Sequence, residues 1–250
     1  MSDDTDTRIS PTLHPGIAGE IPDYDEDTRP LLGQTETAVD AAFKALQSIH
    51  NAKEGAALNP SLNPFEQLVA VDDHAIKVMN KVYGSWSRAV DVLNNNISTM
   101  EKELNAPVES KASRAMATEI RQHFARLEQG PRMNALRKAI EAGDETTATA
   151  VLGAPSYLSG FDPELHAEFL RDWHEAQQPV TAKKVRAMKA AADMLNNRYT
   201  LLRGAVEKAV GVHEEYNEDR QGRRLLVRRW TAAEIRERVR ASNERFAVPV

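Results

Sequence analysis

The chain has 250 residues and a formal net charge of −5; 41% of its residues are hydrophobic and 6% are aromatic, and it contains no cysteine. This length accommodates one large domain or two small ones, and the composition favours helix over sheet. The lack of cysteine excludes disulfide bonds, thiolate zinc sites and cysteine nucleophiles. No apolar run reaches the roughly 18 to 20 residues that cross a bilayer, and the acidic start is unlike a secretory signal, so we expect a soluble, intracellular protein.

Charge is distributed unevenly along the chain. Residues 1–30 carry eight acids and two bases, whereas residues 220–245 carry nine arginines and three glutamates. Such asymmetry is typical of interaction tails, although ends that are simply solvated would look the same. The first 33 residues are acidic and rich in proline, and we expect them to form a disordered tail.

Helical periodicity dominates from residue 34 onwards. A first helix is expected over about 36–54 and a second over about 64–105, which Asn63, Pro64 and Glu66 would start with a capping box. A third helix follows Pro107, so we expect residues 34–130 to form a long helical hairpin. Residues 131–180 read as short helices and loops.

Residues 181–221 show the most regular apolar pattern and predict one long heptad helix. Its helix-packing seam is Val185, Met188, Leu195, Tyr199, Leu202 and Val206. The seam fits packing inside the same chain and packing against another copy equally well.

Residues 222–250 predict a basic C-terminal helix. Thr231 and Glu234 form a capping box that would start this helix at Ala232, and Trp230 is placed to staple against Ile235. The residues expected to contact a protein partner or nucleic acid are Arg223, Arg224, Arg228, Arg229, Trp230 and Arg236. We favour an acidic protein surface over nucleic acid, because no series of stacking aromatics or glycine-rich spacer accompanies the arginines.

Motifs for catalysis and for metal or cofactor binding are missing from the sequence. It contains no GxGxxG, GxxxxGK[ST] or GxSxG motif, and the stretch that begins at His213 departs from the HExxH zinc pattern at Asn217. His166 and His174 lack the further ligands of a closed site. We therefore expect no catalytic residue, metal or cofactor.

The stretch ALRKAIEAGDETTATAVLGAPSYLSG, residues 135–160, resembles a segment of uncharacterised helical proteins encoded by tailed phages and prophages. The resemblance covers about a tenth of the chain. It implies a structural or assembly role in a virion, and a location in the virion or in the cytoplasm of a bacterial host. It carries over no functional residue.

Together these features predict an all-α fold, an elongated helical bundle or hairpin with long coiled-coil-like helices. The functional hypothesis is a non-enzymatic structural or assembly protein, such as a phage scaffold, connector or internal protein. Its expected partners are other protein subunits, a second copy among them, and no membrane. The alternatives are a nucleic-acid-binding or packaging accessory protein that uses the C-terminal arginines, and an enzyme of unrecognised type.

Overall fold

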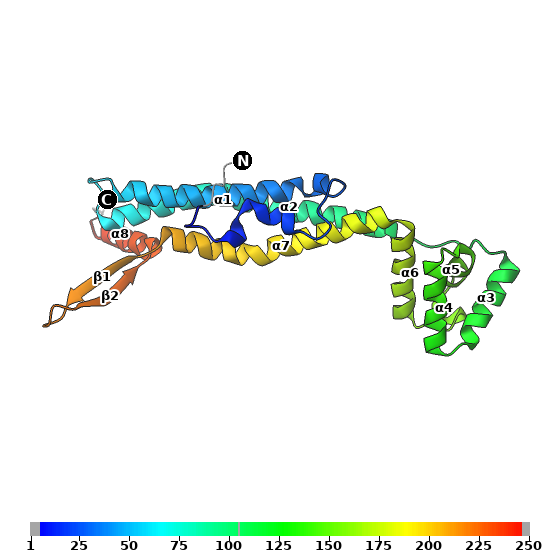
Figure 1. Cartoon of the computed structure of the whole chain (residues 1–250). Coiled ribbons are helices and arrows are strands. Elements are labelled where there is room, and N and C mark those ends of the chain that lie inside the picture. Colours follow the sequence, from blue (N-terminus) through cyan, green and yellow to red (C-terminus); the bar gives the residue numbers. More distant parts are fainter. Residues whose placement is uncertain (1–5, 105, 247–250) are drawn as a thin grey trace. The chain divides into compact units, whose positions relative to one another are not determined.

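The fold is mainly α-helical, as the sequence predicts (Figure 1). The computed structural model describes residues 6–104 and 106–246. The α-helices are α1 (Arg29–Ala57), α2 (Pro64–Leu104), α3 (Arg114–Arg126), α4 (Gln129–Glu141), α5 (Glu145–Leu152), α6 (Pro163–Gln177), α7 (Pro179–Val210) and α8 (Ala232–Phe246). Three short 3-10 helices, η1 (Pro11–Leu13), η2 (Pro15–Glu20) and η3 (Ser156–Leu158), and two strands, β1 (His213–Glu218) and β2 (Arg224–Trp230), complete the described elements. No helix among these residues is both long and apolar enough to cross a membrane.

The chain divides into two compact units. Unit 1 comprises the described residues of 1–21, 31–93 and 190–250, and unit 2 comprises those of 22–30 and 94–189. Helices α2 and α7 each contribute residues to both units.

Unit 1 is built on the packing of α1, α2 and α7. The indole Nε1 of Trp86 on α2 donates a hydrogen bond of 3.3 Å to the carbonyl oxygen of Leu195 on α7. Ser48 on α1 and His74 on α2 share a hydrogen bond of 2.8 Å. The largest fully buried side chains of this core are Leu32, Leu46, Ile49, Leu93, Leu195 and Leu202. Burial of these residues supplies the apolar free energy that holds the three helices together.

Residues 6–21, the N-terminal segment, are part of unit 1 and are packed against its helices, so the predicted disordered tail is corrected for them. Ile9, Leu13, Ile17 and Ile21 recur every four residues and are each at most 6% exposed. Arg8 ties the segment to α1 through Glu54, with Nη1 and Oε1 2.7 Å apart. The spacing of the four apolar residues was obscured by the prolines between them, and their burial offsets the entropy of ordering the segment. Residues 1–5 of the predicted tail lie outside the described residues.

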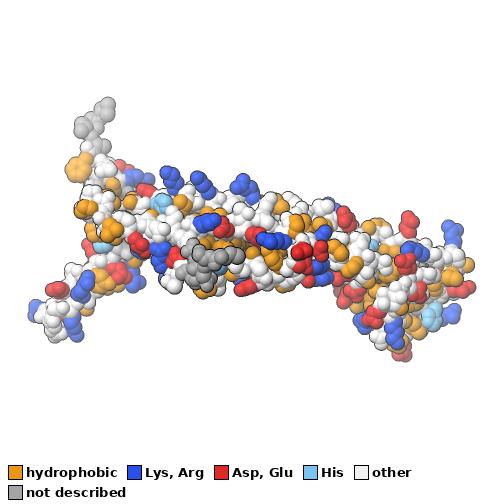
Figure 2. Space-filling model, turned by 45° about the horizontal axis from the view of Figure 1, so that its top comes forward, with side chains coloured by type: hydrophobic (Ala, Val, Ile, Leu, Met, Phe, Trp, Pro, Cys, Tyr) orange, Lys and Arg blue, Asp and Glu red, His pale blue; other side chains and the backbone are white. Residues whose placement is uncertain are grey.

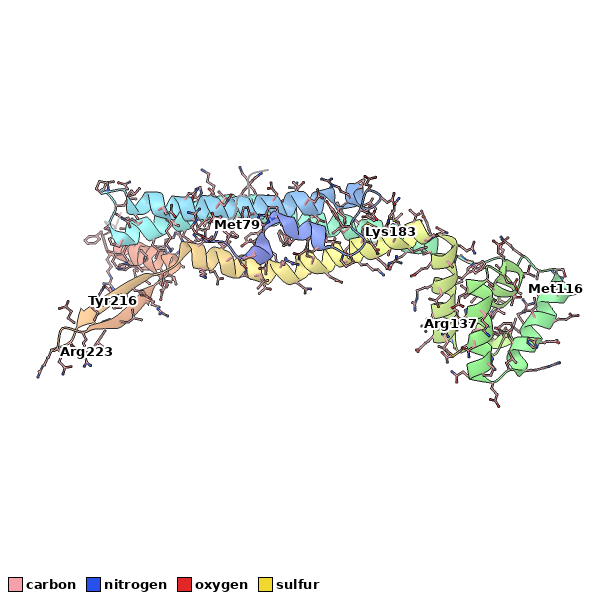
Figure 3. The ribbon with its side chains drawn as sticks, viewed as in Figure 1. Met79, Met116, Arg137, Lys183, Tyr216 and Arg223 are labelled. Atoms are coloured by element: carbon pink, nitrogen blue, oxygen red, sulfur yellow. The ribbon has the colours of Figure 1, made fainter. Side chains whose placement is uncertain are left out.

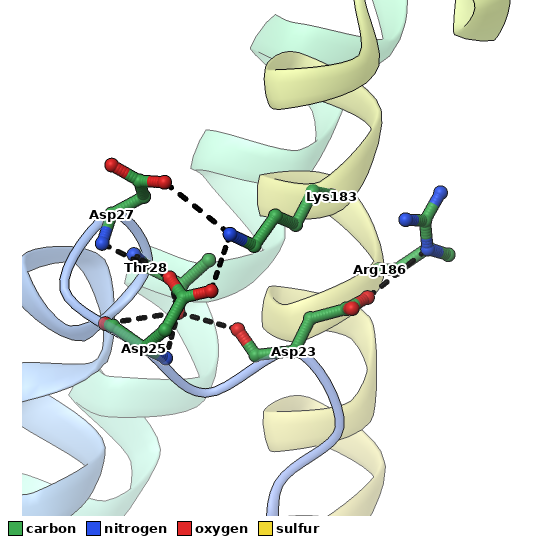
Figure 4. A network of polar contacts seen from close by, with 6 residues as sticks. All are labelled: Asp23, Asp25, Asp27, Thr28, Lys183 and Arg186. Atoms are coloured by element: carbon green, nitrogen blue, oxygen red, sulfur yellow. Dashed lines mark hydrogen bonds and ion pairs between the residues drawn. The ribbon is translucent and has the colours of Figure 1, made fainter.

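An acidic cluster in unit 2 precedes α1 (Figure 4). Lys183 on α7 contacts the carboxylates of Asp25 and Asp27, and Arg186 Nε lies 3.1 Å from Asp23 Oδ2. These contacts neutralise much of the acidic charge that the sequence assigned to a free tail. The Lys183 ammonium, through its hydrogen bond, lowers the pKa of Asp25.

The rest of unit 2 is a cluster of short helices around an aromatic core. The buried core residues are Phe124, Leu136, Ile140, Ala148, Val151, Leu152, Phe161, Phe169 and Trp173. Helix α3 packs against α5 and η3. This corrects the predicted hairpin of residues 34–130. Helix α3 does not pair with the long helix α2 but packs among the short helices of unit 2, and the long helices that pair within this range are α1 and α2 in unit 1. The chain enters α3 through an irregular stretch that Lys111 fixes, because its backbone N–H donates to Thr149 Oγ1 at 2.9 Å.

Two further corrections concern the C-terminal third. The predicted heptad helix of residues 181–221 ends at Val210, where Gly211 adopts a φ of +80°. In the predicted basic region of residues 222–250, the helix begins at Ala232 as expected, but residues 224–230 before it form strand β2. Strand β1 was missed because its residues, HEEYNE, show no apolar alternation.

Candidate interaction site

The strands β1 and β2 form an antiparallel hairpin in unit 1 that extends away from the three long helices (Figure 1). Asp219 organises its turn: its Oδ1 accepts backbone N–H groups from Gln221 at 2.8 Å and Arg223 at 2.9 Å. Gly222 supplies the left-handed residue of the turn, with a φ of +74°. A register shift between Glu215 and Tyr216 separates the base of the hairpin from its tip.

The two strands carry opposite charge. Strand β1 contains three glutamates and no lysine or arginine, and β2 contains three arginines and no acid. The register places unlike charges opposite each other, in the pairs Glu214 with Arg229, Glu215 with Arg228, and Glu218 with Arg224. Cross-strand pairs of this kind stabilise a ladder, by about 0.2 to 1 kcal/mol each. Charge pairing therefore replaces much of the apolar face that a strand would normally offer.

One set of hairpin side chains surrounds Tyr216. Glu214 accepts hydrogen bonds from the Tyr216 hydroxyl and, at 2.9 Å, from Arg229 Nε. The guanidinium of Arg224 lies 4.4 Å from the centre of the Tyr216 ring. The Tyr216 hydroxyl, followed by Arg229, lowers the pKa of Glu214, and the hydrogen bond to Glu214 raises the pKa of Tyr216. Glu214 is thus held in its charged form as the partner of Arg229.

Trp230 anchors the base of the hairpin to the helices. It is 8% exposed, and its Nε1 donates to Glu215 Oε2 at 2.8 Å. The guanidinium groups of Arg228 and Arg238 lie 3.7 Å and 4.8 Å from its ring. Phe65, at the start of α2, meets the same indole edge to face at 5.7 Å. This sandwich couples β2, α2 and α8 through one aromatic ring.

Helix α8 begins as the sequence predicts. The backbone N–H of Thr231 donates to Glu234 Oε2 at 2.8 Å and that of Glu234 to Thr231 Oγ1 at 3.3 Å, which confirms the capping box. Arg236 binds α8 to α2 with its two terminal nitrogens, which lie 2.5 Å from Asp72 and 2.6 Å from Asp73.

Each of the six residues predicted as a contact site has a partner inside the chain. In addition to the pairs above, Arg223 Nε lies 2.8 Å from Asp219 Oδ2. Figure 3 labels Arg223 near the free end of the hairpin and Tyr216 closer to its base. Sequence reasoning missed these acidic partners on β1 and α2. The sequence did contain a sign of the hairpin. An acidic run is followed by turn residues, Asp219 and Gly222, and then by a basic run, which is the order expected of a hairpin whose strands carry opposite charge. That these arginines contact another molecule stays a prediction.

Exposed apolar side chains lie at the tip of the hairpin and beside its base. Leu225, Leu226 and Val227 are 53%, 45% and 58% exposed. In Figure 2 the hairpin is the arm at the lower left, and blue basic side chains lie at its free end. Beside the base, a groove of about 610 Å³ is lined by Asn63, Phe65, Glu66, Val69, Ala70, Asp73, Trp230, Ile235, Arg238 and Val239. The hairpin therefore combines apolar contact area with charge.

The predicted packing seam of α7 is used mainly inside the chain. Val185 and Met188 are buried in unit 2, and Leu195 and Leu202 are buried in unit 1. Val206 is half-buried, and Tyr199 is 39% exposed and meets Tyr83 edge to face at 5.7 Å. Packing within the chain therefore occupies most of the seam, and its coiled-coil geometry stays a prediction.

Within residues 6–104 and 106–246, no group of three His, Cys, Asp or Glu side chains is placed to hold a metal ion. Comparison with protein-family models, curated proteins and solved structures gives no match.

Proposed function

We propose that the protein is a non-enzymatic structural or assembly protein that binds other protein subunits through the hairpin of β1 and β2. The observation that carries the proposal is the surface of this arm. It exposes three consecutive apolar residues, Leu225, Leu226 and Val227, among arginines whose charge is balanced by acids in the same hairpin. Apolar area beside satisfied charge suits a protein partner.

Nucleic-acid binding by the arginine cluster is the alternative, and the charge pairing argues against it. Residues 213–230 hold five arginines and four acids, so the arm is nearly neutral. A surface that binds phosphates gains its affinity by neutralising them and releasing counterions. Arginines already paired with carboxylates contribute little to that release.

The class of assembly rests on the sequence alone. The resemblance of residues 135–160 to proteins of tailed phages and prophages supports a place in a phage particle, as a scaffold, connector or internal protein.

Site-specific photo-cross-linking in the native cells or particles tests the proposal. A photoreactive residue in place of Leu226 should cross-link to a protein subunit. The matched control is the same residue in place of Leu58, which is 83% exposed in the α1–α2 loop of the same unit and should give no specific product. Equal cross-linking at the two positions, or cross-linking of Leu226 to nucleic acid, would contradict the proposal.

A further inference from the structure

The hairpin has two open edges. Among the described residues the sheet consists of β1 and β2 alone, so each strand has one side with no strand beside it. Proteins usually protect such edges with charged side chains, proline, β-bulges or a covering element. The two strands contain no proline and their tip is largely exposed, so charge is the protection there, and it disfavours only a strand of like charge. The register shift after Glu215 disrupts the edge near the base and leaves the tip as the regular part.

The edges differ in charge, and this difference selects what can pair with them. Two copies joined through β1 and β1 would bring together strands with three glutamates each, and β2 with β2 would join strands with three arginines each. Like charges opposite each other destabilise a ladder. Joining β2 of one copy to β1 of the next continues the alternation of acidic and basic strands already present in the hairpin.

We propose that a second copy of this chain adds its β1 strand, antiparallel, to the open edge of β2. The inference rests on the proposed function and deepens it by naming the partner. In the register of the hairpin itself, Glu218 of one copy faces Arg224 of the other, and Tyr216 faces Leu226. Each charged side chain then lies between two of opposite sign, and the exposed apolar residues of the tip gain neighbours.

The symmetry of the assembly follows from this contact. The two edges that meet are different, so the interface is heterologous, and every added copy leaves one β1 edge and one β2 edge open. Such contacts close into rings or continue as chains. Strands of six and seven residues bury less surface than the roughly 1,200 Å² of a stable interface, so the association is weak, concentration-dependent and sensitive to salt.

Disulfide trapping tests the pairing directly, because the chain has no cysteine of its own. Two single variants are made, Asn217→Cys on β1 and Leu225→Cys on β2. The two residues are register partners and have no ion pair to lose. Neighbouring strands lie about 4.8 Å apart, within the Cα separation that a disulfide spans, whereas β1 strands of successive copies lie about twice as far apart.

The full-length variants are oxidised mildly, singly and mixed in equal amounts. We expect a disulfide-linked dimer in the mixture and at least tenfold less from either variant alone. The matched control, Leu58→Cys mixed with Asn217→Cys, should give none. Hydrogen exchange of the hairpin amides verifies that each variant keeps its strands.

Each other outcome overturns the inference in a recognisable way. A dimer from Asn217→Cys alone, as abundant as in the mixture, would show pairing of like strands. No dimer in the mixture, with hairpin amides still protected, would show that copies do not pair here. If Leu226 then cross-links to a different protein, the proposed function stands without self-pairing; if it cross-links to no protein, both fail.

Discussion

The indole Nε1 of Trp230 donates a 2.8 Å hydrogen bond to Glu215 Oε2 on the neighbouring strand. The same ring is covered by Arg228 at 3.7 Å. One buried aromatic side chain therefore holds the acidic and basic strands together at the point where they leave the helices. The contacts of Trp230 therefore set how stably the hairpin is attached to the helices.

Replacing Trp230 separates these contributions. Trp230→Phe keeps a stacked ring and loses the hydrogen bond, so we expect a cost of about 1 kcal/mol. Trp230→Ala also removes the buried ring, so we expect about 3 to 5 kcal/mol and loss of amide protection in β1, β2 and the first turn of α8. Urea unfolding and hydrogen exchange measure both. Phe246→Ala, at a residue that is 81% exposed, is the control and should change little; a Trp230→Ala variant that behaved like it would contradict the anchoring role.

Two glycines with open space around them should respond in opposite directions to alanine. Gly222 has a φ of +74° in the hairpin turn, so Gly222→Ala should destabilise the hairpin by about 1 to 2 kcal/mol through backbone strain alone. Gly204 lies within α7 with nothing within 4 Å of an added Cβ. Gly204→Ala should stabilise the protein by about 0.5 to 1 kcal/mol. Exchange of the hairpin amides measures the effect of Gly222→Ala, and thermal unfolding measures that of Gly204→Ala. If both substitutions stabilised or both destabilised the protein, the left-handed turn at Gly222 would be contradicted.

In unit 2, Arg132 on α4 donates hydrogen bonds to backbone carbonyls at the C-terminal end of α3. Its Nε donates to the Phe124 carbonyl at 2.9 Å and its Nη2 to the Leu127 carbonyl at 2.6 Å. Lysine cannot reproduce this fork, so Arg132→Lys should destabilise unit 2 by about 2 kcal/mol. The control is Arg137→Lys on the same helix, where the guanidinium lies 5.9 Å from the Phe169 ring. Urea unfolding should show a loss at least twice as large for Arg132→Lys, and equal losses would exclude a special role for the fork.

The N-terminal segment should loosen in mild acid through His50. His50 lines a cavity of about 220 Å³ with Arg8 and Ile9, and burial, followed by the charge of Arg8, lowers its pKa below the usual 6.5. Its contribution to stability is therefore complete above pH 6.5 and is lost as the pH falls through the lower folded value. Asp6, whose pKa the hydrogen bond from Arg8 lowers from 3.8 to about 2, keeps its contribution until the pH falls below about 4.

Thermal unfolding at pH 7.5 and pH 5 checks this assignment. The difference between the two melting temperatures should shrink in His50→Gln, whose side chain does not titrate. His123→Gln, at an exposed position on α3, is the control and should keep the wild-type difference. A His50→Gln variant with an unchanged difference would assign the pH dependence to other groups.

The helices of this fold were largely predictable because their signals are local. Asn63 accepts the backbone N–H groups of Phe65 and Glu66 at 3.0 Å, and Glu66 accepts that of Asn63 at 2.9 Å, as the capping-box sequence predicts. Helix α2 accordingly begins at Pro64, and its apolar spacing of 3.6 residues carries it to Leu104. Capping and periodicity act within a few residues, so one sequence suffices to find them.

The hairpin and the ordered N-terminal segment were missed because their stability comes from contacts distant in sequence or from charge. Arg8 meets Glu54, and Arg236 meets Asp72 and Asp73, more than 160 residues earlier. Strand β1 has a single large apolar side chain, Tyr216, and therefore no apolar alternation. Periodicity cannot find such elements, although opposite charges flanking a turn near Gly222 would have pointed to the hairpin.

Sedimentation velocity of the purified chain shows whether the hairpin joins copies of this protein through edges of opposite charge. A dilution series is run at about 50 mM and about 500 mM salt, because paired surface charges are screened at the higher concentration. We expect species heavier than the 27.8 kDa monomer, whose share rises with protein concentration at low salt and falls at high salt. A single 27.8 kDa species at every concentration and both salt levels would contradict this pairing of copies.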